Sequence, residues 1–295
     1  MIHYECCPVC KSKSIEKDID STDYTVSKEI FPIWKCNSCT VKFTQDVPSQ
    51  EAIGRYYKSD NYVSHSDTKK GFIHSLYHTV RSITLKSKKN LIISETRVKK
   101  GNILDIGCGT GAFLSKMKSA DWSILGLEPD EMAAEKASIL YKIQPQNPIE
   151  LFSKAPESFD AITMWHVLEH VHQLEEYVVQ LKKILKKDGV LFIAVPNYTS
   201  FDSKLYKNHW AGYDVPRHLY HFSPKSMEVL MNNHGLNIKK IKPMWFDPFY
   251  VSMLGELQQY GKNNILKAFL IGFLTDIISL FRNKKCTSLI YVITK

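Results

Sequence analysis

The sequence contains no hydrophobic run long enough to cross a membrane, no internal repeat and no low-complexity tract. In its most apolar late segment, residues 265–281, the longest uncharged stretch is 268–275, far short of the ~20 residues that a spanning helix needs. The first seven residues show no basic region leading into an apolar stretch, so no secretory signal is visible. These absences predict a cytoplasmic protein in which disulfides would not persist.

The composition has no strong bias. The chain has 295 residues, of which 44% are hydrophobic and 23% are charged. Such a balance is typical of a soluble globular protein and excludes a disordered chain, a collagen-like repeat and a disulfide-rich miniprotein. The length is sufficient for one large domain with a buried core and a second, smaller one.

The charge balance is positive, with 39 Lys and Arg against 30 Asp and Glu, or +9. Residues 81–100 hold seven basic residues and one acid, Glu95. Such a face can attract a phosphate-bearing substrate, an anionic membrane or RNA, but a solvated helix face is the simpler interpretation.

Three regions differ in pattern. Residues 1–48 carry cysteines and strand-like runs at 24–26 and 41–43, and residues 49–100 have a mostly helical, polar and aromatic pattern. From residue 101 to 295, strands and helices alternate, which predicts an α/β protein with a parallel sheet. We expect strands at 102–106, 123–127, 159–165 and 190–195 and helices at 113–119, 130–140 and 174–185, the last ending in the cations and glycine of 186–189. Residues 141–152 contain two prolines, so a strand there would be weak.

A glycine-rich turn follows the first of these strands. Asp105-Ile106-Gly107-Cys108-Gly109-Thr110-Gly111 lies between a strand and a helix, where glycines allow close backbone approach and the helix N-terminus offers free N–H groups. Glu128 ends the next strand and is placed to accept hydrogen bonds from both ribose hydroxyls of a nucleoside. Because Gly107, Gly109 and Ala112 also fit the dinucleotide pattern, the turn alone does not decide the cofactor.

The motifs taken together resemble class I S-adenosylmethionine-dependent methyltransferases, in the broad group that includes the ubiquinone-biosynthesis O-methyltransferases. The resemblance covers about residues 101–237, and a dehydrogenase offers no reason for its later segments. Beside the glycine turn and Glu128, it rests on the segments 159–162, 165–171, 185–189 and 195–197. It implies a Rossmann-like, mostly parallel sheet that ends in an antiparallel hairpin, strands 237–245 and 288–294, with an insertion at about 247–285.

The resemblance also implies roles for individual residues. Asp105 and the turn of Gly107, Cys108, Gly109 and Gly111 would hold the methionine part of S-adenosylmethionine. Glu128 would hold its ribose, and Trp165 and His166 would line the methyl-transfer cleft. The acid that usually contacts adenine has no clear match in this sequence.

The segment after the fifth strand is where this fold places substrate-facing groups. Trp210, Asp214 and Arg217 are the expected substrate-binding residues, although Arg217 can equally pair with Asp214. A hydroxyl acceptor would also need its proton removed, for which the candidates are His166, His218 and His221. A histidine here can instead cap the following helix. Tyr57, Tyr62 and His65 have the chemistry to close over the cofactor, although local packing is the simpler role.

Residues 166–170 also match the H-x-x-E-H string of one class of zinc proteases. That string must lie within a helix, whereas His166 is expected to end a strand. We therefore interpret the match as accidental.

Two C-x-x-C pairs, Cys7 with Cys10 and Cys36 with Cys39, supply four thiolates for tetrahedral zinc. The sequence predicts a small structural zinc ribbon, in which Cys6 can replace Cys7. Cys108 and Cys286 are not expected to be ligands.

The sequence therefore predicts a methyltransferase that O-methylates a small or lipid-linked metabolite. The alternatives are a C-methyltransferase of a nucleotide-linked keto sugar, since similar zinc-binding N-terminal domains occur in such enzymes, and a non-enzymatic nucleic-acid-binding module. We expect no nucleic-acid partner for the enzyme. Residues 265–281 can cover the substrate cleft or rest on a membrane surface, but a buried core helix or a homodimer contact is the simpler interpretation.

Overall fold

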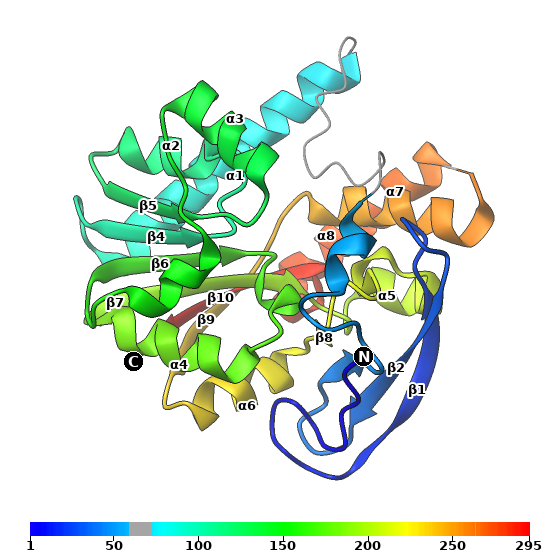
Figure 1. Ribbon diagram of the computed structural model, residues 1–295. Coiled ribbons are helices and arrows are strands. Elements are labelled where there is room, and N and C mark those ends of the chain that lie inside the picture. Colours follow the sequence, from blue (N-terminus) through cyan, green and yellow to red (C-terminus); the bar gives the residue numbers. More distant parts are fainter. Residues whose placement is uncertain (59–71, 263) are drawn as a thin grey trace.

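The computed structural model describes residues 1–58, 72–262 and 264–295 (Figure 1). Tyr62 and His65, which we considered as residues closing over the cofactor, lie outside the described residues. The described part contains two sheets, one of six strands and one of four.

The six-stranded sheet has the order β5-β4-β6-β7-β10-β9. β5, β4, β6 and β7 run parallel, and β10 is antiparallel to both of its neighbours. This arrangement confirms the predicted Rossmann-like fold with its antiparallel C-terminal hairpin. The strands are β4 (Asn102–Ile106), β5 (Ser123–Leu127), β6 (Phe159–Trp165), β7 (Leu185–Pro196), β9 (Asn237–Pro243) and β10 (Ser288–Thr294).

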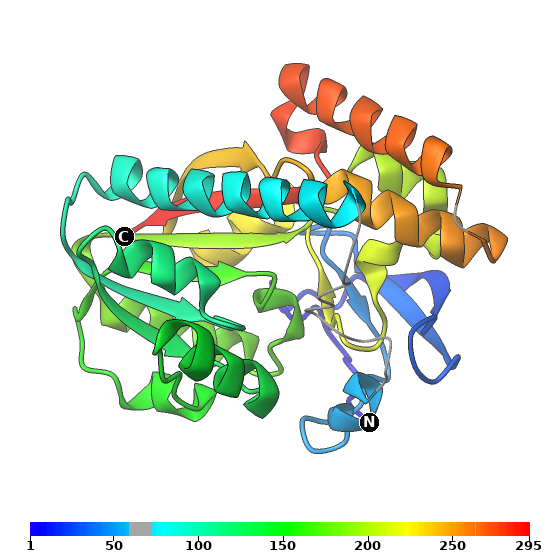
Figure 2. The ribbon, with the colours of Figure 1, turned by 90° about the horizontal axis from the view of Figure 1, so that it is seen from above.

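Helices cover both faces of this sheet because its central strands are apolar on both sides. In β7, Leu191, Ile193 and Val195 face a cluster that includes α4 and α6, whereas Phe192 and Ala194 face one that includes α1 and α2. Figures 1 and 2 show this layering, with the long α1 lying across the sheet. The helices are α1 (Phe72–Thr96), α2 (Ala112–Lys118), α3 (Glu131–Tyr141), α4 (Leu174–Ile184) and α6 (Pro224–Asn233).

Two local expectations were wrong. Residues 24–26 form a turn instead of a strand, because the Asp23 carboxylate accepts hydrogen bonds from the backbone N–H groups of Thr25, Val26 and Ser27. Residues 186–189 belong to β7 instead of ending α4, because Leu185 already pairs with Phe159 of β6. The weak strand after α3 is reduced to one bridge between Leu127 and Gln146.

The four-stranded sheet combines strands of the N-terminal cysteine-bearing segment with one strand from the segment that follows β7. β1 (Ile15–Thr22), β2 (Ile30–Cys36) and β3 (Lys42–Thr44) are antiparallel. β8 (Tyr220–His221), from the segment with the expected substrate-binding residues, pairs with β3 and completes the sheet. The cysteine-bearing segment therefore shares one sheet with residues more than 170 positions later in the sequence. The domain boundaries at 48 and 100 stay predictions.

The region between β9 and β10 forms a helical hairpin where we expected an insertion at 247–285. α7 (Asp247–Tyr260) and α8 (Ile265–Phe281) pack against each other and against α5 (Phe201–Tyr206). Figure 2 shows the pair projecting on the side of the molecule away from β4 and β5. No helix within the described ranges is both long and apolar enough to cross a membrane. The short 3-10 helices are η1 (Ile53–Tyr57), η2 (Pro148–Ser153), η3 (Leu168–His170), η4 (Lys207–His209), η5 (Ala211–Tyr213) and η6 (Asn283–Lys285).

Candidate active site

The glycine turn connects β4 to α2. Gly107, Gly109 and Gly111 have φ values of +69°, +53° and +76°, in the region that favours glycine. A Cβ at Gly107 would lie 2.5 Å from Cγ2 of Val167, so a side chain cannot fit there without rearrangement. The turn therefore presents bare backbone, and Gly111 caps the N-terminus of α2.

Glu128 lies beside this turn, directly after β5. Its carboxylate accepts hydrogen bonds from the backbone N–H of Gly109 at 2.6 Å and of Asp130 at 3.0 Å. Burial raises the pKa of Glu128, although these two N–H groups oppose the shift. The arrangement fits a ribose-binding acid held against a glycine turn.

The buried Asp105 and the half-buried Lys88 are two titratable groups that influence each other near the turn. Asp105 is 1% exposed and accepts a 2.6 Å hydrogen bond from Thr163. Burial raises the pKa of Asp105 to about 7, while burial lowers that of Lys88 to about 8. Lys88 comes from α1, and its Nζ lies 4.1 Å from the ring centroid of Trp165. Sequence reasoning missed Lys88, which appeared only as one cation in the basic run of 81–100.

Cys108 faces the core instead of the cleft. Its side chain is 7% exposed, and a Cβ at Gly126 would lie only 2.6 Å from its Sγ. Any contact of Cys108 with a cofactor would therefore come from its backbone.

Trp165 and His166 end β6, as predicted. Trp165 Nε1 and His166 Nε2 are buried and have no hydrogen-bond partner among the described residues. His166 also has a φ of +59°, an uncommon conformation for a residue with a side chain and one that clusters at functional sites. Because buried polar atoms are normally hydrogen-bonded, the two free nitrogens mark this edge of the sheet as a ligand site.

Glu169 lies near the other nitrogen of His166, and both of its carboxylate oxygens are buried without a hydrogen-bond partner among the described residues. His166 Nδ1 lies 3.4 Å from Oε1 of Glu169, whose side chain is fully buried. Burial disfavours a charged imidazole, but the carboxylates of Glu169 and Asp247 together outweigh burial and raise the pKa of His166. Likewise, burial opposes ionisation of Glu169, but His166 lowers its pKa below the usual value.

Glu169 also belongs to a cluster with His170 and His218. One ligand atom from each lies within 4.8 Å of the others, which is the spacing required to hold one metal ion. His170 Nδ1 lies 3.0 Å from the carbonyl oxygen of Arg217, and His218 Nδ1 lies 2.9 Å from that of Gly212. Because a carbonyl only accepts, each Nδ1 donates and each Nε2 lone pair is left free, as in metal-binding histidines.

The cluster combines η3 with the loop before β8. Sequence reasoning did not select Glu169 or His170, although both stand in the quoted segment 165–171. The only signal was the H-x-x-E-H string, whose residues lie here at a strand end and in a 3-10 turn instead of a helix. Tyr57 contacts the same cluster, with its hydroxyl 3.1 Å from His170 Nδ1.

Arg217 is 1% exposed and connects three segments of the chain. Its guanidinium donates to Asp214 at 2.7 Å, to Asp23 at 2.9 Å and to the carbonyl oxygen of Tyr56 at 2.8 Å. The structure therefore has the Arg217–Asp214 pair that the sequence left open as an alternative. The substrate-binding roles of Arg217 and Asp214 stay predictions. Trp210, also 1% exposed, donates its indole N–H to Asp202 at 2.7 Å.

His221 lies on β8, with Nε2 3.2 Å from the hydroxyl of Thr44. Its Nδ1 is buried and unpaired among the described residues, and burial lowers the pKa of His221 well below the usual value. Neither His218 nor His221 caps α6, because Ser223 does so through a reciprocal capping box with Ser226.

The four predicted zinc ligands meet in one group. The Sγ atoms of Cys7, Cys10, Cys36 and Cys39 lie within 4.8 Å of one another, with Cys7–Cys39 at 3.5 Å and Cys10–Cys36 at 3.6 Å. Four sulfurs about 2.3 Å from a tetrahedral zinc would be roughly 3.8 Å apart, so the group fits a structural zinc ion. Cys6 is not part of the group.

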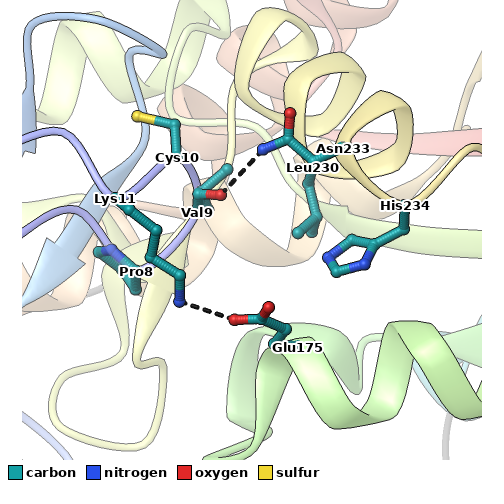
Figure 3. Close-up of a pocket in the computed structure, with 8 residues that line it drawn as sticks. All are labelled: Pro8, Val9, Cys10, Lys11, Glu175, Leu230, Asn233 and His234. Carbon is teal, nitrogen blue, oxygen red and sulfur yellow. Dashed lines mark hydrogen bonds and ion pairs between the residues drawn. The ribbon is translucent and has the colours of Figure 1, made fainter.

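The first cysteine knuckle is attached to the large sheet's helices. Lys11 Nζ forms a 2.8 Å ion pair with Glu175 of α4, and Asn233 of α6 donates to the carbonyl oxygen of Val9 at 3.3 Å (Figure 3). A cavity of about 130 Å³ lies between them, lined by neither the glycine turn nor the histidine cluster. This contact therefore anchors the ribbon and lies apart from the candidate active site.

With this geometry established, comparison with known proteins gives the family. Residues 78–241, more than half of the chain, match the family described as "Methyltransferase domain". The chain belongs to this family.

The relatives and solved structures agree with this assignment. The bovine mitochondrial ubiquinone biosynthesis O-methyltransferase is 27% identical over 164 residues, covering 50% of this chain and 44% of that protein. The enzyme of the same name from Pelagibacter ubique is 27% identical over 138 residues, covering 41% and 56%. The chain thus spans about half the length of the curated relatives. A SAM-dependent methyltransferase from Archaeoglobus fulgidus has the same fold, with a TM-score of 0.52, 19% identity and coverage of 76% of this chain and all of that one.

The chain is therefore a member of a methyltransferase family and has the fold of a solved SAM-dependent methyltransferase, and we expect it to be an enzyme that uses S-adenosylmethionine. The family match favours an enzyme over the alternative of a non-enzymatic nucleic-acid-binding module. The residue roles within the site, the acceptor and the oligomeric state stay predictions.

Proposed function

We propose that the enzyme transfers a methyl group to a hydroxyl oxygen of a small or lipid-linked metabolite. The observation that carries this proposal is the His166–Glu169 pair at the end of β6, with His166 Nε2 buried and unpaired beside Trp165. A hydroxyl needs a base, and an imidazole oriented by a carboxylate is a common one. The names of the curated relatives support oxygen as the attacked atom.

The cofactor would bind on the glycine turn. The backbone of Gly107 to Gly111 and the Asp105 carboxylate would hold its methionine part. Glu128 would hold its ribose by accepting hydrogen bonds from the ribose hydroxyls instead of from the Gly109 N–H. S-adenosylmethionine supplies a methyl group on a positively charged sulfur, so the leaving group is already activated. The protein's contribution is alignment of the acceptor oxygen with that methyl group.

In the reaction, the acceptor oxygen forms a bond to the methyl carbon as the carbon–sulfur bond breaks. The hydroxyl proton passes to Nε2 of His166, and Glu169 stabilises the resulting imidazolium. The cleaved bond's electrons stay on sulfur as a neutral thioether. His218 and His221 are the remaining candidates for the base, but no described carboxylate lies as close to either as Glu169 lies to His166.

A specific observation supports a second way to activate the acceptor. One ring nitrogen each of His170 and His218 and a carboxylate oxygen of Glu169 have the spacing to hold a divalent cation. A cation there would bind two neighbouring acceptor oxygens, as in a catechol, and lower the pKa of the attacking hydroxyl. The proposal for His166 and this one differ in whether Mg²⁺ or Mn²⁺ restores the activity that chelation removes.

The test uses methyl-labelled S-adenosylmethionine and a fractionated cell extract, with label counted in organic, small aqueous, protein and RNA fractions. We expect label in the organic fraction, in a base-stable methyl ether. His166→Gln should lower the rate by about 10²–10⁴ with cofactor binding retained, whereas the exposed His3→Gln should not change it.

Each other outcome has a distinct meaning. Carbon-bound label in a nucleotide-linked sugar would replace the proposal with the sugar C-methyltransferase. Loss of activity on chelation, restored by Mg²⁺ or Mn²⁺, would favour the cation over His166 as the activating group. An unchanged rate for His166→Gln would remove His166 as the base.

A further inference from the structure

α8 has the opposite burial pattern to an ordinary surface helix. Its buried side chains are mostly small, whereas its large apolar side chains are exposed. The buried positions recur at helical spacing and face α7 and α5: Ala268, Ile271, Gly272, Thr275 and Ser279. The exposed ones are Ile265, Leu266, Phe269, Leu270, Phe273, Leu274, Leu280 and Phe281, with Leu266 at 85% and Phe281 at 86% exposure.

The small residues allow the two helices to pack closely. A Cβ at Gly272 would lie 2.9 Å from the Cα of Phe249, so no larger residue fits between α7 and α8 there. In water, a helix normally buries its large apolar side chains and exposes polar ones. Small residues at a helix contact with large apolar ones outside are typical of helices surrounded by lipid.

α7 also has large exposed side chains that are mostly apolar. Tyr250, Met253, Leu257 and Tyr260, spaced three or four residues apart, are between 38% and 63% exposed. Side chains at this spacing lie on one side of a helix. Because α7 packs against α8, the exposed apolar side chains of both helices belong to one hairpin, and exposed apolar side chains gathered in this way mark an interaction site. We call these side chains the α7–α8 face.

Within the part of the chain that the structure describes, the exposed charges that flank α8 in sequence are positive. Lys262 lies in the loop at one end of α8, and Arg282 and Lys284 follow its other end. The acidic side chains of the hairpin that the structure describes are buried or half-buried: Asp247, Glu256 and Asp276. Glu256 is in addition neutralised by a 2.8 Å ion pair with Lys267. The adjoining α5 and η4 add two more exposed cations, Lys204 and Lys207.

We propose that the α7–α8 face docks on the surface of an anionic lipid bilayer, with both helices lying in the plane of the interface. Large apolar side chains on one side and cations at the borders are the two features that such binding uses. A second copy of the chain fits less well. Because both ends of α8 carry cations, either orientation of a symmetric pair would bring like charges together.

Membrane docking goes beyond the methyl transfer and does not depend on it. It has a consequence for the acceptor, because α7 contacts η4 and η5, which flank Trp210. Docking would bring the segment with the expected substrate-binding residues to the lipid–water boundary. A lipid-linked acceptor would then reach the enzyme without leaving the bilayer.

Vesicle flotation with the full chain tests this, with no methyl acceptor present. We expect binding to vesicles that contain phosphatidylglycerol, at least tenfold weaker binding to pure phosphatidylcholine, and weakening by salt. Trp245, 37% exposed beside α7, provides a second readout, because brominated lipids should quench its emission. The quenching should be lost in Trp245→Phe.

Two variants separate the apolar and the cationic contributions. Leu266→Ser with Phe281→Ser, both changes at outward side chains, should weaken vesicle binding by about hundredfold and leave the melting temperature unchanged. Arg282→Gln with Lys284→Gln should weaken binding roughly 25-fold, and only to anionic vesicles. Met132→Ser with Ile139→Ser, at equally exposed apolar positions of α3, is the matched control and should bind normally.

Three results would overturn the proposal. The first is no binding to anionic vesicles, and the second is binding that the Leu266→Ser/Phe281→Ser variant retains. The third is a lipid-free dimer in sedimentation experiments that this variant dissociates, which would assign the face to a second copy. None of these results bears on methyl transfer, which is measured separately.

Discussion

The two halves of the candidate active site are built in different ways. The cofactor half uses backbone and side chains from consecutive elements, β4 to β6, within about 65 residues of sequence. The acceptor half brings together Asp23, Tyr56, Glu169 and Arg217, which span 194 positions between Asp23 and Arg217. The first half depends on local turn geometry, and the second depends on tertiary contacts that the zinc ribbon supports.

Removal of the metal should have the largest effect and should act on the acceptor half alone. We expect the purified chain to hold about one zinc per molecule, and chelation or Cys39→Ser to unfold residues 1–48, because a structural zinc contributes much of the folding energy of so small a unit. β3 would then release β8. Zinc content, thermal unfolding and calorimetric titration with S-adenosylmethionine measure this.

The control is Cys6→Ser, which changes a neighbouring cysteine outside the ligand group. Cofactor affinity should survive chelation within a few-fold while methyl transfer is lost. If chelation instead abolished cofactor binding, the two halves would not be separable.

Arg217→Met is expected to have the next largest effect. It leaves the buried Asp23 and the half-buried Asp214 carboxylates without their cation, and breaking a buried pair typically costs about 3–5 kcal/mol. Lys100→Met removes one partner of an exposed pair with Asp121 and should change stability by less than about 1 kcal/mol. Urea unfolding compares the two variants. Equal stabilities would show that Arg217 does not hold the acceptor half together.

Gly107→Ala tests the cofactor half. The φ of +69° and the 2.5 Å approach to Val167 make a Cβ unfavourable by about 1–3 kcal/mol or more, so S-adenosylmethionine should bind at least tenfold more weakly. Gly54→Ala is the matched control, since a Cβ there meets nothing within 4 Å. Calorimetric titration gives both affinities. Normal binding by Gly107→Ala would remove the turn from the cofactor site.

The elements that build the cofactor half were easier to predict from the sequence than the contacts of the acceptor half, because the signals for those elements are local. Strands such as 102–106, 159–165 and 288–294 were placed correctly because their apolar runs are local signals, and Gly101 and Gly107 also bracket the first of them. The four cysteines were grouped correctly because their spacing is a motif.

The acceptor half was harder to predict because its neighbours are distant in sequence. Nothing local to Arg217 indicates Asp23, and nothing in the basic run of 81–100 distinguishes Lys88, which reaches Trp165, from its exposed neighbours. Glu169 looked like part of a family segment, and only the fold turns it toward His166 and His218. The spacing of apolar residues or cysteines along the sequence predicts helices, strands and metal ligands. Which polar residues share a site depends instead on contacts between helices and strands that are distant in sequence.

The smallest expected effect is a shift in pH dependence, and it tests the junction of the two halves. His166 must be neutral to accept a proton, and its pKa is raised, so the rate should fall as pH drops through a value above 6.5. Glu169→Gln removes the nearer of the two charges that raise this pKa, leaving Asp247 to oppose burial, which lowers it. The acid limb of kcat should therefore move to lower pH by about one unit or more. Glu131→Gln, on the exposed start of α3, should leave the profile unchanged. If the limb stayed in place for Glu169→Gln, another group would be accepting the proton, and Glu169 would belong to the acceptor half only as a partner of His170 and His218.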